Sequence, residues 1–476
     1  MILNFSVNNF RSFREAQTLS LVASNRFNDH TDHLRTIPDD ENKLLPVAVI
    51  YGANGAGKSN LIKALAFLEH LVLRGVEEKK PTGRRPFLLD KASTGKPTEF
   101  NLQFVEEGRV YALGCRVSDK HIEAEWLSVL RDGKEISVYE RITRDDGNVA
   151  IEAGPVLLED GWGDNKNALA LTRIKGQPLP NQLFLHVVGK GMREQDQGPV
   201  LAGAIRWFKK RLFIISPDSS FGDLAGLVAQ NDDFTAFAGA FLKRVATGVD
   251  RLHVDTSKMD EKVLLGLGFG KKILEMVSEL SPEDTAVLPG PDGAQLILER
   301  KEDGNIQIRT VRSEHVTAAG DRVSLPFAEE SDGTQRLTNL LPALHSVGDQ
   351  KAVYVIDEID RSLHPLLAKG FVRSFLQTCA TQGGQLIVTT HETAFLDLDL
   401  LRRDEIWFAD KKMDVGNTEL YSLADYKVRT DLKIDKAYLQ GRFDAIPPIE
   451  TELPGWVCEI MNELKPKGEK TSEESP

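Results

Sequence analysis

Apolar residues form short runs near both ends of the chain. Residues 2–13 alternate apolar and polar side chains, whereas residues 46–51 (PVAVIY) are continuously apolar. Both patterns predict strands. A glycine-rich loop comes directly after the second run, followed by the segment LIKALAFLEHL, whose leucines fall on one helical face. Residues 46–71 are therefore predicted to form a strand, a loop and a helix.

The middle of the chain changes character twice. Short β-rich runs broken by Gly and Asp occupy residues 99–142 and predict an antiparallel β subdomain. From about residue 161 to 320 helical patterns prevail, in AIRWFKKRLFII, DDFTAFAGAFLKRVATGV and MDEKVLLGLGFGKKILEMVSEL, beside a hairpin that turns at Asp303-Gly304. Apolar runs at 351–357 and 384–390 then predict buried parallel strands with a helix between them.

These patterns predict an α/β fold, in which a mixed sheet with flanking helices and an antiparallel β subdomain is split by a compact, mainly helical insertion. The insertion is expected to be compact because the middle of the chain carries no sustained heptad pattern. The predicted segments are an N-terminal lobe at 1–75, the β subdomain at 76–160, the insertion at 161–324, a C-terminal lobe at 325–463 and a disordered tail at 464–476.

Composition excludes few classes of protein. The 476 residues are 41% hydrophobic, which is ordinary for a globular chain. The sequence contains no apolar run of about 18 residues, the length needed to cross a membrane. We therefore expect a cytoplasmic protein without a membrane partner, in which the three widely spaced cysteines stay reduced. The net charge of −12 gives no support to nucleic-acid binding, although a local basic patch would permit it.

Residues 52–59 (GANGAGKS) fit the phosphate-binding pattern G-x-x-x-x-G-K-[ST], called Walker A. The glycines allow backbone N–H groups to converge on a phosphate, Lys58 supplies a positive charge, and Ser59 can ligate Mg²⁺. The predicted position between a strand and a helix is the one that this chemistry requires. The predicted nucleotide-binding residues are Gly52, Asn54, Gly55, Gly57, Lys58, Ser59 and Asn60.

Asp357 is the last residue of the apolar run KAVYVID, and Glu358 follows it directly. Both carry carboxylates. A Walker B arrangement would use Asp357, with Ser59, to hold Mg²⁺. Glu358 would orient and polarise the attacking water and so act as a catalytic residue. The alternative is an acidic strand end that faces solvent.

Two further elements flank Asp357 along the chain. Residues 330–335 (ESDGTQ) open a helical segment and offer a hydroxyl and free N–H groups to a γ-phosphate. Alternatively, Ser331 or Asp332 simply caps that helix. His391 follows the predicted strand QLIVTT. A histidine at that position either contacts phosphate or is an ordinary residue at the end of a strand.

The motifs NNFRSF, GANGAGKS, ESDGTQR, VIDEIDRSLHP and TTHETAFLD occur in this order. Their combination resembles the ABC ATPase superfamily, in its SMC, RecF and OLD-like branch. ESDGTQRL, DEIDRSLHP and the stretch AYLQGRFDAIP at 437–447 look closest to the RloA/AbiL-type stand-alone ATPases encoded beside phage-defence genes. The fold implied by this resemblance is an ABC-type P-loop ATPase head.

The resemblance also implies a slow, dimerisation-dependent ATPase with ATP and Mg²⁺ as ligands. Its unit would be a head-to-tail dimer, alone or within a larger oligomer, and the catalytic His391 would contact the γ-phosphate in cis. The trans signature, which reads ESDGTQ where transporters have LSGGQ, would reach the partner's γ-phosphate. The implied residues are Ser331, Gly333 and Gln335 for the signature, and Ser362, Leu363, His364 and Pro365 for the D-loop that couples the two sites.

Three functions compete. The first is a dimeric sensor or scaffold in bacterial antiphage defence that controls a separately encoded effector, such as an RloB-like or TOPRIM nuclease. The second is a RecF/SMC-like DNA-repair ATPase that binds DNA directly. The third is a nucleotide-binding module that never turns over, and Glu358 argues against it. The acidic balance and the missing coiled coil favour the first function over the second.

Two weaker features complete the sequence picture. Gln103 lies in the region expected for a Q-loop glutamine, but its surroundings favour a β-strand residue. His30 and His33 lie in a polar stretch without further His or Cys ligands nearby. We therefore interpret them as residues of a surface loop and not as a metal site.

Overall fold

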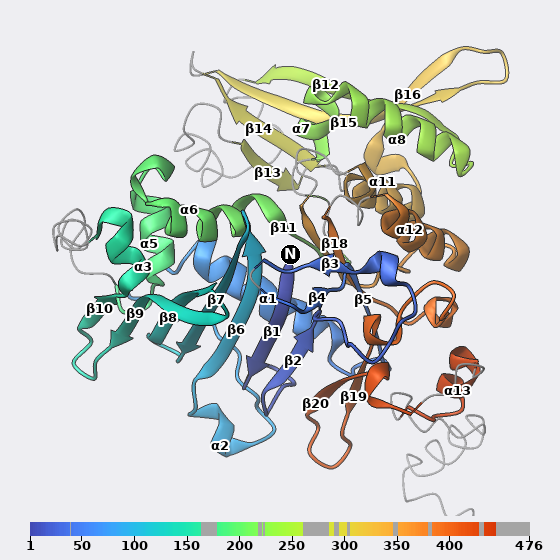
Figure 1. The fold of residues 1–476 in the computed structure, drawn as a ribbon. Helices are drawn as coiled ribbons and strands as arrows, with labels where there is room; N and C mark the ends of the chain where they lie inside the picture. Colours follow the sequence, from blue (N-terminus) through green and yellow to red (C-terminus); the bar gives the residue numbers. More distant parts are fainter. Residues whose placement is uncertain are drawn as a thin grey trace, which may run out of the picture.

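The computed structural model is built from two large sheets, a third smaller one and the helices that cover them (Figure 1). It describes residues 1–38, 40–162, 179–217, 221, 224–259, 285–289, 295–301, 305–345, 351–378, 383–427 and 433–443. The predicted tail at 464–476 lies outside these residues, as do Cys379 and Cys458.

The central sheet has the strand order β11-β17-β18-β5-β19-β20. All of these strands run parallel except β20, which is antiparallel to β19. Every residue of β5, β17 and β18 is buried, which confirms the parallel strands predicted from continuous apolar runs. The strands are β5 (Val47–Tyr51), β11 (Leu212–Ile215), β17 (Val353–Ile356), β18 (Gln385–Thr389), β19 (Ile406–Lys411) and β20 (Thr418–Ser422).

The two faces of the central sheet belong to different hydrophobic cores. Ala48 of β5 packs in a core that includes α1 (Lys58–Leu73) and the antiparallel sheet, whereas its neighbour Val49 packs in a second core with α11 (Asp332–His345) and α12 (Pro365–Gln377). This alternation follows from the two-residue period of a strand. A strand covered on both faces needs apolar side chains at every position.

The antiparallel sheet confirms the predicted β subdomain and extends beyond it. Its order is β10-β9-β8-β7-β6-β1-β2. The first two strands of the chain thus pair with β6 and not with the central sheet. The strands are β1 (Ile2–Asn8), β2 (Gln17–Ser20), β6 (Thr98–Glu106), β7 (Arg109–Val117), β8 (Ile122–Arg131), β9 (Lys134–Thr143) and β10 (Val149–Ala153).

The described residues of the predicted mainly helical insertion at 161–324 contain both helices and an antiparallel sheet that the sequence did not predict as a whole. Helices are present in its first half, at α5 (Phe184–Gly191), α6 (Pro199–Arg206), α7 (Leu224–Gln230) and α8 (Asp232–Arg244). Its second half forms an antiparallel sheet in which β12 pairs with β15, β15 with β14, and β14 with β13, while β16 joins β15. Its strands are β12 (Val249–Met259), β13 (Thr285–Pro289), β14 (Gln295–Arg300), β15 (Ile306–Val316) and β16 (Arg322–Pro326).

The sequence analysis identified only one hairpin of this sheet, although the alternating pattern spans several strands. That hairpin is confirmed as the β14–β15 pair, with Asp303-Gly304 outside the described residues. The run LFII, expected to be helical, forms β11 and pairs with β17 of the central sheet. The helix expected over MDEKVLLGLGFGKKILEMVSEL lies outside the described residues, apart from Met259 at the end of β12.

Shorter elements connect these sheets. The described ones are the two-stranded pair β3 (Arg35–Thr36) and β4 (Lys43–Leu44), the helices α2 (Lys91–Thr94), α3 (Pro155–Leu157) and α13 (Ile434–Leu439), the π-helical turns η2 (Leu158–Trp162) and η4 (Trp207–Arg211), and the 3₁₀ turns η1 (Thr31–His33), η3 (Glu194–Asp196), η6 (Phe327–Glu329), η8 (Thr393–Phe395), η9 (Arg403–Glu405) and η10 (Leu423–Asp425).

One buried amide joins the two large sheets. The side chain of Gln385, at the start of β18, accepts a hydrogen bond from the backbone N–H of Ile2 at 2.6 Å. It donates to the carbonyl oxygens of Ile2 and Leu45 at 2.9 and 3.0 Å. Because these backbone groups are buried, each needs a partner. Gln385 therefore sets the position of β1 at the edge of the central sheet.

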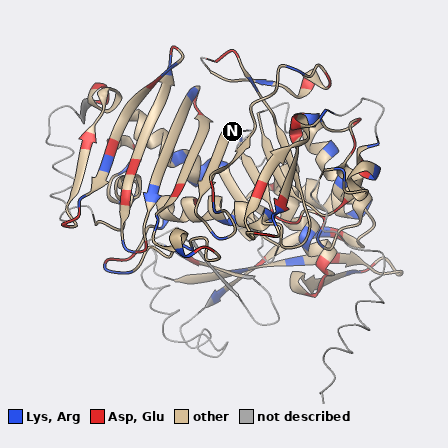
Figure 2. Ribbon diagram, turned by 90° about the horizontal axis from the view of Figure 1, so that it is seen from below, with Lys and Arg blue, Asp and Glu red and all other residues tan. Residues whose placement is uncertain are grey.

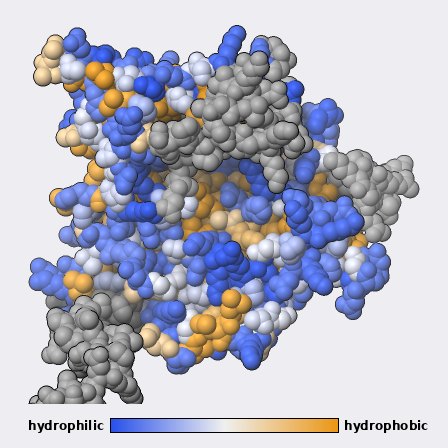
Figure 3. Space-filling model, turned by 180° about the vertical axis from the view of Figure 1, so that it is seen from behind, coloured by the Kyte–Doolittle hydropathy of each residue, from blue (hydrophilic) through white to orange (hydrophobic). Residues whose placement is uncertain are grey.

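The surface matches the composition. Seen from behind, hydrophilic residues cover most of the visible described surface, and apolar residues show mainly in a recess near its middle (Figure 3). No described helix is both long enough and apolar enough to cross a bilayer.

Candidate functional site

The loop between β5 and α1 has the shape of a phosphate cradle. Gly52 and Gly57 both have positive φ angles, 154° and 108°. A Cβ atom at Gly52 would lie 2.2 Å from the carbonyl oxygen of Ala409, and one at Gly57 would lie 2.1 Å from Oγ1 of Thr418. Only glycine fits at these two positions, because both the backbone angle and the space exclude a side chain.

Lys58 begins α1 and turns its ammonium group back over the loop. Its Nζ donates to the carbonyl oxygens of Gly52 at 2.7 Å and Ala53 at 3.2 Å. Burial lowers the pKa of Lys58 to about 8, against the opposing effect of nearby carboxylates. The cation is therefore held by neutral carbonyl dipoles and is poorly solvated. Phosphate oxygens at this position would relieve that desolvation.

A hydroxyl and a carboxylate meet beside the loop. Ser59 Oγ donates to Asp357 Oδ1 at 3.1 Å, and Thr389 Oγ1 donates to the same oxygen at 2.5 Å. Asp357 is buried at the carboxyl end of β17. Oxygen ligands of this kind suit Mg²⁺, which prefers one or two protein oxygens together with water and phosphate oxygens. Ser59 and Asp357 thus form a donor set that fits this cation.

Glu358 is presented by an unusual backbone conformation. Its φ angle is 50°, in the left-handed region, and its N–H donates to Thr389 Oγ1 at 2.8 Å. Arg336 of α11 donates to the carbonyl oxygens of Asp357 at 2.7 Å and Glu358 at 3.2 Å. Asp357 and Glu358 are therefore fixed from both sides, which leaves the half-buried Glu358 side chain next to the cradle.

His391 lies at the same edge of the sheet. Its Nε2 is 3.2 Å from the ammonium of Lys58. Partial burial and the Lys58 charge lower the pKa of His391 below its ordinary value. The neutral ring can therefore accept a hydrogen bond from Lys58 at neutral pH. A terminal phosphate bound by Lys58 would lie within reach of His391.

The structure brings together Lys58, Ser59, Asp357, Glu358 and His391, but the predicted signature lies elsewhere. Ser331 is exposed at the N-terminus of α11, where its Oγ accepts from the N–H of Thr334 at 3.2 Å. Gln335 donates to the carbonyls of Ala328 at 3.0 Å and Glu330 at 2.8 Å. The capping role considered for Ser331 is thus present, and its outward face is open to solvent.

The remaining predicted residues have mixed surroundings. Asn54 and Gly55 are exposed at the tip of the cradle. Ser362 is exposed with a φ angle of 59°, and its carbonyl oxygen would lie 2.8 Å from a Cβ atom at Gly333. Leu363 is buried in the second core. His364 caps α12 by accepting a hydrogen bond from the N–H of Leu366, and Pro365 is the first residue of α12.

Sequence analysis missed two residues that support the cradle, Ser12 and Thr418. Asn60 donates to Ser12 Oγ at 2.8 Å, and Thr418 Oγ1 donates to the carbonyl of Ala56 at 2.8 Å. Thr418 N also donates to the carbonyl of Ser12 at 2.7 Å. Ser12 lies within the NNFRSF motif, which was a signal available in the sequence. Thr418 offered none, because its role arises only when β20 folds beside the loop.

Gln103 does not belong to this site. It lies in β6, where it accepts from Asn4 Nδ2 at 2.7 Å. The β-strand interpretation of Gln103 is therefore confirmed.

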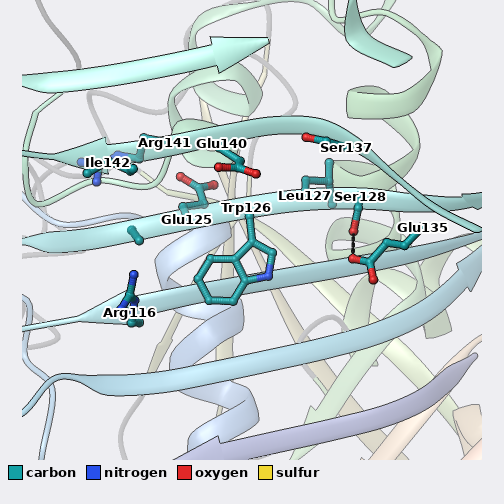
Figure 4. A pocket seen from close by; sticks show the side chains of 11 residues that line it. Arg116, Glu125, Trp126, Leu127, Ser128, Glu135, Ser137, Glu140, Arg141 and Ile142 are labelled. Atoms are coloured by element: carbon teal, nitrogen blue, oxygen red, sulfur yellow. Dashed lines mark hydrogen bonds between the residues drawn. The ribbon is translucent and has the colours of Figure 1, made fainter. Parts of the chain in front are cut away.

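A separate hollow of about 450 Å³ lies on the antiparallel sheet, around Trp126 (Figure 4). Its polar groups are largely paired within the protein. Glu125 accepts from Tyr139 Oη and from two N–H groups at the start of α5, and Ser128 donates to Glu135. The hollow is lined by three carboxylates, from Glu125, Glu135 and Glu140, and by the guanidinium groups of Arg116 and Arg141.

Charged residues of both signs are interspersed over the described ribbon (Figure 2). This distribution matches the net charge of −12.

Comparisons with known proteins give one family match and distant structural likenesses. The family model described as an AAA domain, putative AbiEii toxin, type IV TA system, matches residues 47–167 and 265–397, more than half of the chain. The SMC head domain from Thermotoga maritima is 13% identical with a TM-score of 0.31, and the match covers 88% of this chain and 98% of that one. The SmcHead bound to the C-winged helix domain of ScpA is 15% identical with a TM-score of 0.35, with 88% and 97% covered. No curated protein matches the chain.

The Lys58 environment predicts how polyphosphate binding depends on pH. Since the pKa of Lys58 in the free site is about 8, the charged ammonium prevails below that pH and is lost above it. A ligand that needs the ammonium must then bind together with a proton. Its Kd should rise toward about tenfold per pH unit above pH 8. Fluorescent nucleotide titration from pH 7 to 9 measures this.

Lys58→Arg is the matched variant, because a guanidinium stays charged throughout this range. Its Kd should be nearly level with pH, whatever its absolute value. An equal rise of Kd in both proteins would show that Lys58 does not bind the phosphates.

Proposed function

The chain belongs to the family of AAA domains described as putative AbiEii toxins of type IV toxin–antitoxin systems, and from this premise we propose that it binds and hydrolyses ATP as a head-to-tail dimer. The observation that carries the proposal is the convergence of Lys58, Ser59, Asp357 and His391 at one edge of the central sheet. This set provides a phosphate cradle, a cation site and a group that contacts the terminal phosphate.

Each residue has a role that follows from its contacts. The N–H groups of the cradle and Lys58 bind the β- and γ-phosphates, as phosphoryl transfer depends mainly on positioning and charge stabilisation. Ser59 and Asp357 would hold Mg²⁺, which supplies charge neutralisation at the phosphate oxygens. Glu358 accepts a hydrogen bond from a water molecule and orients this water for attack on the γ-phosphorus. The reaction yields ADP and phosphate.

The dimer proposal rests on where Ser331 lies. The described hydrogen bonds of its hydroxyl stay within the start of α11, and the residue is exposed. A helix N-terminus with an exposed hydroxyl binds phosphate well. We place this end of α11, with Gly333, against the γ-phosphate held by the partner subunit, and the neighbouring Ser362 at the junction of the two shared sites.

The biological role we propose is control of a separately encoded effector, such as a nuclease, in bacterial antiphage defence. The family description, a toxin of a toxin–antitoxin system, supports a defence-type role. The alternative is an ATPase that clamps DNA directly. Copurification of the products of the native operon, followed by ATPase assays with and without duplex DNA, separates the two. A bound effector and DNA-independent turnover support control of an effector, whereas DNA-stimulated turnover without a partner supports the alternative.

Replacement of Glu358 by Gln should stop turnover but keep nucleotide binding. The amide cannot polarise water as the carboxylate does, and a loss of about 10²-fold or more in hydrolysis is expected. The ATP-bound dimer should accumulate, as seen by size-exclusion chromatography with light scattering. Glu392→Gln is the control, because Glu392 only caps η8 through the N–H of Ala394. Wild-type hydrolysis by the Glu358 variant would exclude it as the catalytic carboxylate.

Shared sites predict complementation between two inactive proteins. Lys58→Ala removes the cradle charge, and Ser331→Asp retains a helix cap but repels the partner's phosphate. Mixed, they form a heterodimer in which one site carries both lesions and the other carries neither. Hydrolysis should therefore return in part, to a level set by the fraction of mixed dimers.

Ser331→Asp is preferred to a substitution at Gly333, since a Cβ there would press on the Ser362 carbonyl of the same chain. Ser331→Asn is the neutral cap control and should lose much less activity than the aspartate. Full activity of Ser331→Asp by itself would contradict the shared site.

A further inference from the structure

Two histidines and an aspartate meet on the loop that follows β2 and precedes β3. His30, Asp32 and His33 each offer a ligand atom, and these atoms lie within 4.8 Å of one another. The sequence alone favoured an ordinary surface loop. The structure shows instead that both rings are held in place by groups that leave one ring nitrogen of each available.

The local backbone explains why the rings meet. Residues Thr31–His33 form the 3₁₀ turn η1, and His33 N donates to the carbonyl of His30 at 3.0 Å. In a 3₁₀ turn, residues three apart lie above one another. The two imidazoles accordingly stack with centroids 4.9 Å apart and an interplanar angle of 24°.

Each ring has a hydrogen-bond partner on one of its two nitrogens. His30 Nε2 lies 2.8 Å from the carbonyl oxygen of Leu398, which can only accept, so Nε2 carries the proton and Nδ1 presents a lone pair. His33 Nδ1 lies 3.0 and 3.1 Å from the two carboxylate oxygens of Glu405. With Nδ1 as the donor, Nε2 of His33 presents its lone pair as well.

This arrangement is that of metal-ligating histidines, which donate their second N–H to a carbonyl or a carboxylate. Glu405 is fully buried, and its orientation is fixed by the N–H of Arg402, which donates to Oε2 at 2.8 Å. A buried carboxylate placed behind an imidazole is costly unless the ring it holds carries positive charge. A cation coordinated by His33 would supply that charge.

We propose that His30 Nδ1, His33 Nε2 and the Asp32 carboxylate bind one divalent transition-metal ion of the Zn²⁺ class, with water completing the coordination. Two imidazoles and a carboxylate suit this borderline class. Bonds of about 2.0–2.2 Å require the ligand atoms to approach to roughly 3.4 Å. The exposed Asp32 can provide this movement by side-chain rotation, and the half-buried His30 by a smaller shift that keeps its Nε2 on the Leu398 carbonyl.

The ion would strengthen an existing contact between two segments that are distant in sequence. The loop before His30 already contacts the stretch after His391, since Ser24 N donates to Asp404 Oδ2 at 2.8 Å and Arg402 donates to the carbonyl of Asp29. A cation on His30 and His33 would reinforce this contact through Leu398 and Glu405. The proposal does not depend on the ATPase function.

The test is metal binding by the full chain without nucleotide. Chelator-treated protein is titrated with Zn²⁺ against a chromogenic competitor, and Co²⁺ absorption reports the ligand field. One ion per chain is expected. Binding should be lost in His33→Ala and weakened about 10- to 100-fold in Glu405→Gln, whose amide holds the ring less well. Asp357→Asn should still bind the ion, which separates this site from the proposed Mg²⁺ site.

His121→Ala is the matched control, because the hydrogen bonds made at His121 use its backbone, and it should bind as the wild type does. Circular dichroism checks the fold of each variant. If His33→Ala unfolds, His30→Asn carries the test, since asparagine tolerates the left-handed backbone at residue 30, where φ is 47°. No stoichiometric ion in the wild type, or unchanged affinity in His30→Asn, would overturn the proposal.

Discussion

The strands β5, β17 and β18 run in the same direction, and the candidate site depends on this constraint. Parallel strands place their carboxyl ends at one edge of the sheet, so the residues that follow each strand must meet there. The cradle follows β5, Asp357 follows β17, and His391 follows β18 by one intervening residue. Three sequence segments that lie far apart thereby become one set of groups around a single hydroxyl–carboxylate contact, between Ser59 and Asp357.

Hydrogen bonds from other parts of the chain then hold this edge rigid. Thr389 binds both the carboxylate of Asp357 and the backbone of Glu358, while Arg336 binds their carbonyls from the side of α11. On the other side, Ser12 and Thr418 support the cradle. Because a charged or strained group persists only where its surroundings determine its position, this support explains how Glu358 keeps a left-handed backbone.

The contact between Gly333 and Ser362 links two elements proposed to face a partner subunit. The backbone at 362 lies so close to residue 333 that a Cβ atom would not fit between them. Arg336, one turn further along α11, reaches the backbone of Asp357 and Glu358. A ligand that moves the start of α11 must therefore also act on the residues that end β17. The geometry thus provides a physical connection from an exposed helix end to Glu358, the proposed catalytic carboxylate.

The sequence by itself determined the strands and the chemistry that are encoded locally. Continuous apolar runs identified β5, β17 and β18, and the spacing of glycines with Lys58 and Ser59 identified the cradle, because both patterns follow from the backbone of a few adjacent residues. Only the tertiary structure decided the pairing of β1 with β6, the strand β11 inside a segment expected to be helical, and the support from Thr418. All three depend on contacts between residues that lie far apart in the sequence. The same holds for His30 and His33. Their spacing is local, but the groups that orient them, Leu398 and Glu405, arrive only when the end of the chain folds back onto its beginning.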